Sequence, residues 1–532
     1  MNKHLFTLIG LFFIQACTQL HEHLPIKQQN VTSEFGAVST AHPLATAAAI
    51  QILESGGNAA DAAIAAAYTL AVVEPSMSGL GGRLQCIIRT SDGTIAGIDA
   101  TTQAPAEYDP LSATQAREGY PVIGIPGVVR GLKKLREDYG SLALSTLIEP
   151  AIKHAENGFN LLELESKRHA FAIDAIRNYS GTKQKFLHGD TTYLENELFI
   201  QKDLANTLRI ISEKGEDDFY QGSIAEKIIA DLKANGSTIS ATSLKNYRAE
   251  ASKIVSTKYR DTEVHSLYMP SYGAITLEIL ELLNRTDLSV IDEAEWAKWI
   301  YMTQKRSYED RKAQKSDSMA NVILSKAYLD TVFTNLKYSF NKPSSDTLSL
   351  DGHTTHLSVI DKNGMMVSLT QSLGPNMGSK VVTPTLGFLY ASTLGGYLGE
   401  MQPNERASSH ISPTLVIRGG EPYIALGAAG GSRIVPAIVQ VLSRVIDRGM
   451  TIEEALAAGR VYADDTVMLY EDHEDVLWSA DTWSKLRESG INLEKVEGSG
   501  RFGRVHLVMY HEGVFKAGAD PDWEGSADSP EN

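Results

Sequence analysis

The chain has 532 residues, of which 43% are hydrophobic and 21% are charged, and its formal net charge is −16. These proportions are typical of a globular protein with a full core, and the length allows two or three average domains or one large layered domain. The acidic balance excludes nucleic acid and an anionic membrane surface as the main partner, because both attract basic proteins.

Residues 1–17 have the pattern of a signal peptide. The apolar run Leu5–Ile14 is too short to span a bilayer. It ends in Ile14-Gln15-Ala16-Cys17, which resembles a bacterial lipobox except for Gln15. We expect export from a bacterial cell and a lipid on Cys17 that anchors the protein to a membrane, in the periplasm or at the outer membrane. Plain cleavage is the alternative, and residues 18–30 form a polar tether.

The next segments predict closely packed helices followed by a strand. Ala45–Val73 is rich in alanine and is interrupted at Ser55–Asn58, which predicts two helices with Asn58 as N-cap of the second. A glycine cluster then leads into a strand through Cys86–Ile88, and Val128–Tyr139 predicts another helix. Cys86 is expected to be a buried core residue; the cysteine spacing does not suggest a metal site, and we expect no cofactor.

Residues 141–340 are expected to be mainly helical, and strands are expected to dominate thereafter. Asn363-Gly364 lies between two short apolar-alternating runs, which is the strongest short-range hairpin signal. Further hairpins are predicted at residues 413–426 and 506–517, and a helix is predicted to open at Gly427–Ser432 and to run to about Arg448. This order favours an α+β layered architecture.

The first of these hairpins has a definite predicted register. If the chain turns near residue 363, Leu357 lies opposite Leu369 on an apolar face. The polar face then carries Thr354 opposite Ser372, with His356 on the same side. A threonine hydroxyl at the start of one strand therefore faces a serine hydroxyl at the end of its partner.

Several segments together resemble the γ-glutamyltransferase family of N-terminal-nucleophile hydrolases, over nearly the whole chain after the tether. They are Gly56–Ala63, Gly79–Gly82, Ala104–Ala106, Pro126-Gly127, Thr354–His356, Ser408-Ser409, Ser412–Thr414, Gly430–Arg433 and Ala519–Pro521. The resemblance implies a four-layer αββα sandwich made as one precursor, which cuts itself between His353 and Thr354. Residues 31–353 would form the large subunit and residues 354–532 the small one, and the two fragments would stay associated.

The resemblance also implies roles for individual residues. Thr354 would be the nucleophile, and its new α-amine, with a pKa near ~7.7–8.0, would be the general base. Gly430 and Gly431 would donate backbone N–H groups to the oxyanion, and Ser372 would contact the nucleophile. Ser408 and Ser409 would bind substrate. Taken singly, these motifs are equally typical of a strand start, a helix-entry turn and a polar loop, and His356 is expected to be structural or interfacial.

The chain departs from the family where classical members hold the glutamyl group. An arginine that binds the α-carboxylate is replaced by Thr101, and an asparagine after the second hydroxyl is replaced by Gly374. A glutamine and the aspartate that pairs with the α-amine are replaced by Thr393 and Gly396. Arg83 replaces a glycine of the glycine-rich loop.

The sequence therefore predicts a self-processed amide hydrolase or acyltransferase, similar to glutathione hydrolases but with an altered acyl-group pocket. Its partner would be a small-molecule amide or a peptide. Two alternatives remain at this point: a non-catalytic lipoprotein binding module on the same fold, and an acylase of the cephalosporin-acylase kind. The replacements at the acyl-group positions are compatible with all three.

Overall fold

The computed structural model describes residues 28–112, 115–314, 317–336, 353–464, 466–472, 478–496 and 502–531. The predicted signal peptide, Cys17 and most of the tether lie outside these residues. No helix in the described ranges is long and apolar enough to cross a membrane.

Two seven-stranded antiparallel sheets form the centre of the molecule. Sheet A has the order β1 (Asn30–Ser33), β20 (Val514–Ala519), β19 (Arg504–His511), β15 (Glu421–Ala429), β14 (Thr414–Arg418), β11 (Thr262–Leu267) and β10 (Ile254–Tyr259). Sheet B has the order β21 (Ser526–Asp528), β2 (Gly36–Thr40), β12 (His353–Asp361), β13 (Met366–Gly374), β3 (Arg83–Arg89), β4 (Ile95–Ala100) and β9 (Glu250–Ser252).

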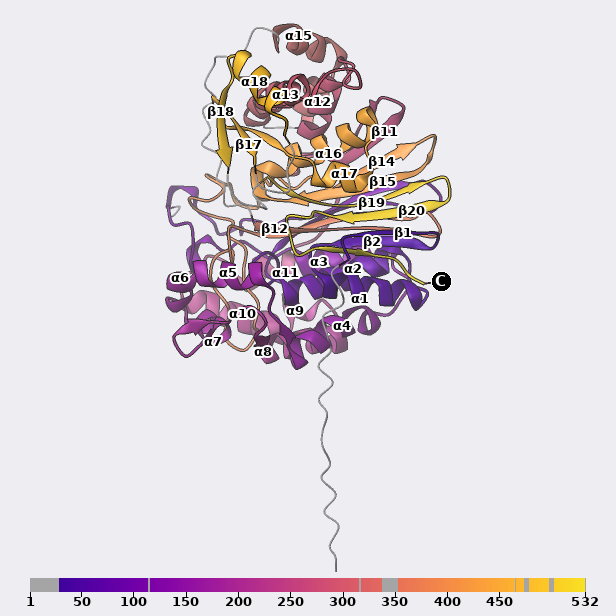
Figure 1. Ribbon diagram of the computed structural model, residues 1–532. Helices are drawn as coiled ribbons and strands as arrows, with labels where there is room; N and C mark the ends of the chain where they lie inside the picture. Colours follow the sequence, from indigo (N-terminus) through magenta and orange to yellow (C-terminus); the bar gives the residue numbers. More distant parts are fainter. Residues whose placement is uncertain are drawn as a thin grey trace, which may run out of the picture.

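Helices cover the outer face of each sheet (Figure 1). The helices on the side of sheet B are α1 (Pro43–Glu54), α2 (Ala59–Val73), α3 (Val128–Tyr139), α4 (Leu144–Asn157), α5 (Glu163–Phe171), α6 (Ile173–Arg177), α7 (Ser180–Phe186), α8 (Lys202–Lys214), α9 (Asp218–Gln221), α10 (Ser223–Ala234) and α11 (Ala241–Asn246). Those on the side of sheet A are α12 (Gly273–Leu283), α13 (Glu293–Ala313), α14 (Asp317–Ile323), α15 (Lys326–Leu336), α16 (Ile434–Arg448), α17 (Ile452–Ala457) and α18 (Ala480–Glu488).

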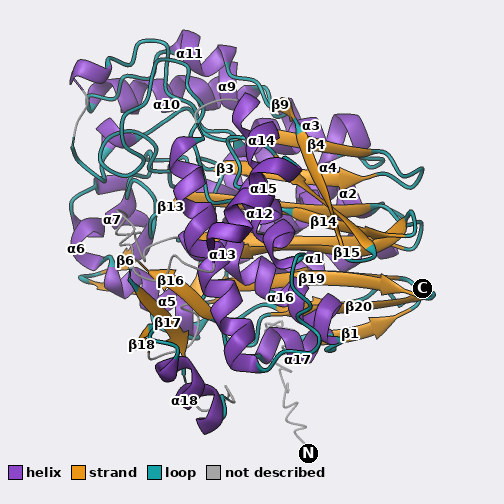
Figure 2. Ribbon diagram, turned by 90° about the horizontal axis from the view of Figure 1, so that it is seen from above, coloured by secondary structure: helices purple, strands orange, loops and turns teal. Residues whose placement is uncertain are grey.

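Smaller elements complete the described chain. They are the 3₁₀ turns η1 (Pro110–Ser112), η2 (Tyr120–Val122) and η3 (Gly431–Arg433), the three-stranded sheet β16 (Val461–Asp464), β17 (Val467–Glu471) and β18 (Asn492–Val496), and the pairs β5 (Phe159–Asn160) with β8 (Leu198–Phe199) and β6 (Leu187–His188) with β7 (Thr191–Thr192). Seen from above, the strands of the two large sheets run in similar directions beneath α12, α13 and α16 (Figure 2). The mixed α+β class is confirmed.

Most predicted elements have the expected positions. The alanine-rich segment forms α1 and α2, and Asn58 caps α2 in a reciprocal capping box with Asp61. Every residue of α2 is buried, because alanine lets neighbouring backbones approach closely. Cys86 is buried and free, as predicted.

The region from residue 141 to residue 340 is mainly helical, as predicted, since it holds α4 to α15, but it also contains the strands β10 and β11, which extend sheet A. β10 and β11 form a tight hairpin with each other, and β11 joins sheet A through β14, which is distant in sequence. One expectation about elements was wrong. Gly427 does not open a helix, because β15 continues to Ala429 and α16 begins only at Ile434.

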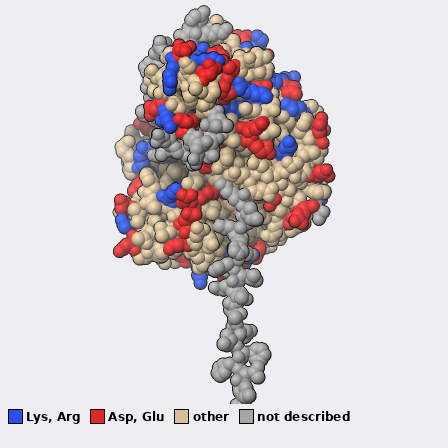
Figure 3. Space-filling view, in the orientation of Figure 1, with Lys and Arg blue, Asp and Glu red and all other residues tan. Residues whose placement is uncertain are grey.

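Acidic and basic side chains are mixed over the face shown in Figure 3, with neither sign forming one continuous field there. Neighbouring opposite charges often pair, as in Lys133 with Asp217 and Lys134 with Asp138, both at 2.8 Å. Ion pairs at such exposed positions contribute only about 0–1 kcal/mol each to stability.

Candidate active site

The hairpin of β12 and β13 has the predicted register. Thr354 lies opposite Ser372, Leu357 opposite Leu369 and Val359 opposite Val367. The pairing becomes irregular between His353 and Thr354, at the bond where the resemblance places self-cleavage. Both hydroxyl residues are almost completely buried, with Thr354 4% exposed and Ser372 3% exposed.

The Ser372 hydroxyl is the centre of a short hydrogen-bond chain. Thr354 Oγ1 donates to Ser372 Oγ at 3.0 Å, and Ser372 Oγ donates to the carbonyl oxygen of His353 at 2.8 Å. The backbone N–H of Gly374 donates to the same Ser372 oxygen at 2.9 Å. The candidate nucleophile is thereby linked, through one hydroxyl, to the carbonyl of the peptide bond that precedes it.

The apolar and polar faces of the hairpin have different neighbours. Leu357, Val359 and Leu369 join the core cluster that contains the alanines of α2. The polar face instead contacts sheet A, where Ser358 Oγ donates to the carbonyl oxygen of His506 at 3.0 Å and Ser368 Oγ donates to that of Leu426 at 2.8 Å. The interface between the sheets is therefore partly polar and internally hydrogen-bonded.

His356 is structural, as expected. Its Nδ1 lies 2.7 Å from Thr370 Oγ1 and its Nε2 lies 3.0 Å from Ser358 Oγ. Burial moves its pKa well below the ordinary value, so the ring is neutral. The imidazole fills the space beside Gly427 of sheet A, where a Cβ would lie 2.3 Å from the ring.

A buried ionic cluster lies directly behind the hairpin and was missed by sequence reasoning. Glu74, after α2, accepts a hydrogen bond from Thr355 Oγ1 at 2.6 Å and one from Trp523 Nε1 at 3.3 Å. Arg168 Nη2 lies 3.8 Å from Glu74 and 2.7 Å from Glu165. Burial raises the pKa of Glu74 to about 7 despite these partners. Glu165 and Arg168 are neighbours on α5, but Glu74, Thr355 and Trp523 come from distant segments, so no local pattern indicates the whole cluster.

His353, before the predicted cleavage point, is also neutral. Burial and the charges of Arg168 and Arg504 lower its pKa to about 3. Its Nδ1 lies 3.3 Å from Met77 Sδ. The side chain is held beside the hairpin without carrying a charge.

Gly430 and Gly431 lie where β15 ends and η3 begins. Both have positive φ angles, +135° and +61°, which favour glycine. A Cβ at Gly430 would also lie 2.8 Å from Gly503 Cα. Strand β15 lies against the hairpin across the sheet interface (Figure 1). Donation of their N–H groups to an oxyanion stays a prediction.

Ser408 and Ser409 form hydrogen bonds with residues that the sequence did not indicate. Arg311, on α13, donates to Ser408 Oγ and stacks over the Tyr272 ring at 4.0 Å. Ser409 Oγ accepts from the backbone N–H of Ile411 at 3.2 Å. The serine hydroxyls are therefore already hydrogen-bonded within the protein, and their contact with substrate stays a prediction.

Three of the positions at which the chain departs from the family, Thr101, Thr393 and Gly396, have small uncharged residues. Thr101 is fully buried, and its hydroxyl donates to Asp99 at 2.9 Å. Thr393 is fully buried as well, and its hydroxyl donates to Thr102 Oγ1 at 2.8 Å. A Cβ at Gly396 would lie 2.6 Å from the carbonyl oxygen of Gln115. These positions present no free charged group in this structure, and their role in binding stays a prediction.

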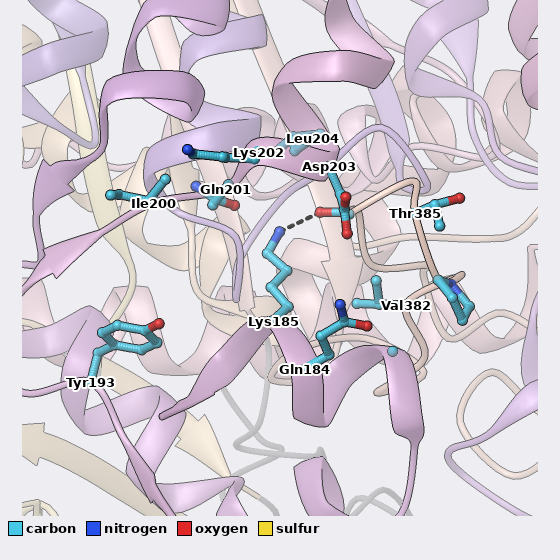
Figure 4. Close-up of a pocket in the computed structure, with 13 residues that line it drawn as sticks. Gln184, Lys185, Tyr193, Ile200, Gln201, Lys202, Asp203, Leu204, Val382 and Thr385 are labelled. Atoms are coloured by element: carbon cyan, nitrogen blue, oxygen red, sulfur yellow. Dashed lines mark hydrogen bonds between the residues drawn. The ribbon is translucent and has the colours of Figure 1, made fainter. Parts of the chain in front are cut away.

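A separate cavity of about 250 Å³ lies between α7, the start of α8 and the loop 382–387. Figure 4 shows Lys185 pointing into it, where its ammonium donates to the carbonyl oxygen of Gly387. Burial lowers the pKa of Lys185 to about 7. None of the predicted site residues lines this cavity, so it is distinct from the candidate active site.

Comparisons with known proteins identify the family of the chain. The Gamma-glutamyltranspeptidase family model matches residues 45–529. Glutathione hydrolase proenzyme of Escherichia coli (strain K12) is 29% identical, over 81% of each chain. That of Pseudomonas sp. (strain A14) is 30% identical, over 87% of each.

A solved structure has the same fold over almost its whole length. Cephalosporin acylase from Bacillus halodurans superposes with a TM-score of 0.87 at 24% identity, covering 97% of this chain and 99% of that one. This likeness shows the shared fold. The chain belongs to the gamma-glutamyltranspeptidase family and is an enzyme of its hydrolase and transferase class.

Proposed function

We propose that the protein cuts its own chain between His353 and Thr354 and then acts as a threonine-nucleophile amide hydrolase or acyltransferase. The observation that carries this proposal is the chain of hydrogen bonds from Thr354 Oγ1 through Ser372 Oγ to the His353 carbonyl oxygen. A binding module would have no physical need for a buried hydroxyl pair directed at one peptide bond, and family membership favours the enzyme.

The geometry suits an acyl shift from nitrogen to oxygen. Thr354 Oγ1 forms a bond to the carbonyl carbon of His353, and the C–N bond of the same peptide breaks, which leaves an ester. The hydroxyl proton passes by way of Ser372 and the former carbonyl oxygen to the departing amine. Water then hydrolyses the ester, which leaves a carboxylate on His353 and a free α-amine on Thr354.

The free α-amine of Thr354 supplies the general base for the reaction with substrates. An amide nitrogen cannot accept a proton, whereas an α-amine with a pKa near ~7.7–8.0 is partly neutral at working pH and can serve as base. Thr354 Oγ1 would attack the substrate carbonyl, and Gly430 and Gly431 would donate N–H groups to the oxyanion. Removal of one such donor typically costs about 2.7–4 kcal/mol in the barrier.

The acyl group accepted by this chain is proposed to differ from γ-glutamyl. Thr101, Thr393 and Gly396 supply no charge, and the two threonine hydroxyls are bonded within the protein. A zwitterionic head group that loses its water without charged partners is strongly disfavoured. An acylase activity of the cephalosporin-acylase kind shares the same mechanism and differs only in substrate.

Self-cleavage is tested by denaturing gel electrophoresis with N-terminal sequencing of the purified full chain. The wild-type protein should give two fragments, the smaller beginning at Thr354, and Thr354→Ala should give one uncut chain. An uncut wild-type chain after prolonged incubation would refute the proposal. Thr331→Ala, on the exposed side of α15, serves as the matched control and should cut normally.

The altered specificity is tested with γ-glutamyl p-nitroanilide. The processed protein should hydrolyse it far more slowly than the Escherichia coli relative does under the same conditions. Equal kcat/KM values for the two proteins would contradict the proposed change of acyl group.

A further inference from the structure

The cavity of about 250 Å³ beside α7 contains charged groups of both signs and lies apart from the candidate active site. Its volume equals roughly eight water molecules at about 30 Å³ each, which suits a ligand of the size of one amino acid. Its charged lining residues are Lys185, Lys202 and Asp203, and its apolar ones include Ile200, Leu204 and Val382 (Figure 4).

Lys185 brings a cation to the cavity that no carboxylate neutralises by direct contact. Its ammonium group donates to the carbonyl oxygen of Gly387, and it forms no ion pair with any described residue. Glu165 and Asp203 act on its charge only through space. Because an ammonium group has three N–H donors, two of them have no acceptor in the described part of the chain. A bound carboxylate would accept from them.

The first turn of α8 adds backbone donors beside this ammonium group. The N–H groups of Lys202–Leu204 have no acceptor within the described ranges, since the side chain of the N-cap residue Gln201 forms no cap hydrogen bond. Gly387 holds the two sets of donors together. A Cβ on Gly387 would lie 2.5 Å from Leu204 N, and the carbonyl oxygen of Gly387 accepts from Lys185. An ammonium group and free N–H groups at a helix N-terminus both favour a carboxylate.

Asp203 and Gln201 supply acceptors at the same place, and Figure 4 shows the Lys185 side chain extending toward them. The Asp203 carboxylate is half-buried and has no hydrogen-bond or ion-pair partner among the described residues. Gln201 is only 4% exposed; its amide nitrogen donates to the carbonyl oxygen of Val72 at 2.7 Å, whereas its Oε1 has no donor in the described part of the chain. A buried acceptor without a donor is destabilising, and an ammonium group on a ligand would satisfy both acceptors.

We propose that this cavity is a binding site for a free α-amino acid with an aliphatic side chain. The carboxylate of the amino acid accepts from Lys185 and the first turn of α8, and its ammonium group donates to Asp203 and to Gln201 Oε1. The apolar wall contacts its side chain. A carboxylate without the ammonium group is repelled by Asp203, and an amine without the carboxylate leaves Lys185 unpaired. This site goes beyond the proposed function and does not depend on Thr354.

Three ligands with one shared side chain test the proposal by calorimetric titration of the full chain. L-Leucine carries both charges, 4-methylpentanoate carries only the negative charge and 3-methylbutylamine carries only the positive charge. Leucine should bind at least about tenfold more tightly than either of the other two, because each of them lacks one set of charged hydrogen bonds. Equal affinities for leucine and 4-methylpentanoate, or no leucine binding up to its solubility limit, would overturn the proposal.

Variants of the lining residues assign the binding to this cavity and not to the candidate active site. Lys185→Met should weaken leucine binding by at least about tenfold, and Asp203→Asn should lower the preference for leucine over 4-methylpentanoate. Lys183→Met on α7 and Glu213→Gln on α8 are the matched controls, since both side chains are exposed and outside the cavity, and both variants should bind leucine as the wild type does. Unchanged leucine affinity in Lys185→Met would place the amino acid elsewhere and overturn the proposal.

These measurements separate the amino-acid site from the proposed function. Titration needs neither self-cleavage nor turnover, so a chain that binds leucine in this cavity but does not cut itself would refute the proposed function alone. A chain that cuts itself but shows no preference for leucine would overturn this site alone. Bound leucine should raise the melting temperature of the wild-type chain more than that of Lys185→Met. If Lys185→Met does not fold, Asp203→Asn and the comparison of the three ligands still decide.

Discussion

Ser372 matters at the scale of single residues because one hydroxyl serves three groups. It accepts hydrogen bonds from Thr354 Oγ1 and from the backbone N–H of Gly374, and it donates to the His353 carbonyl oxygen. Alternation along two strands was enough to predict that Ser372 faces Thr354. The hydrogen bond to the preceding carbonyl was not predictable, because it depends on the irregular pairing at His353.

Replacement of Ser372 by alanine should slow self-cleavage by about 100- to 1,000-fold, the range found when one oxyanion donor is removed. Ser372→Thr keeps the hydroxyl and should retain most of the rate. The measurement is the fraction of cut chain against time on denaturing gels. Cleavage of Ser372→Ala at the wild-type rate would show that this hydroxyl takes no part in the reaction.

At the scale of elements, the two sheets are held in register by polar contacts rather than by apolar packing alone. Ser358 and Ser368 of the hairpin donate to carbonyl groups of β19 and β15. His356 fills the space left by Gly427. The sequence predicted both strands and their polar face, but it did not show that this face lies between two sheets, since a polar face is more often turned to solvent.

Substitution of Gly427 by alanine should lower the free energy of unfolding by about 1–3 kcal/mol, because the added methyl group overlaps the His356 ring. Urea denaturation measures the change. Gly79→Ala is the control, since the nearest atom to its added Cβ is Leu389 O at 3.6 Å, an ordinary contact. Equal stabilities of the two variants would contradict the packing described for His356.

At the scale of the whole molecule, segments on either side of the predicted cleavage point are interleaved. In sheet B, β12 lies between β2 and β13, and β13 lies between β12 and β3. Sheet A combines β1, β10 and β11 with four strands from the C-terminal part. The buried Glu74 joins the two parts again through Thr355 and Trp523.

The two fragments should therefore remain together after cleavage. Separation would expose edges and faces of both sheets, so we expect the fragments to elute as one species on size-exclusion chromatography and to part only in denaturant. Cleaved protein that elutes as two separate species in plain buffer would be incompatible with this sheet order.

Glu74 should make stability depend on pH. Burial raises the pKa of Glu74 to about 7 in the folded protein, above the usual value of about 4.5. Between pH 4.5 and pH 7 the folded protein therefore keeps a proton on Glu74 that the unfolded chain has lost. The contribution of this proton to the free energy of unfolding is fully present below pH 4.5 and is lost as the pH rises through 7. It is on the order of 3 kcal/mol.

Urea denaturation at pH 5 and pH 7.5 measures this contribution. The wild-type protein should lose stability over this interval relative to Glu74→Gln, whose amide does not titrate. Parallel behaviour of the two proteins would mean that Glu74 is ionised throughout.

The sequence by itself determined the local parts of this protein: the capped helices α1 and α2, the three hairpins, and the Thr354–Ser372 pair. Each follows from residues close together in the chain, through periodicity, turn chemistry or capping. Only the tertiary structure decided where the polar face of the hairpin lies, which residues hold Ser408, and that Lys185 and Asp203 line one cavity. Those outcomes depend on contacts between distant segments, whose free energies are set by burial and by partners that no local pattern reveals.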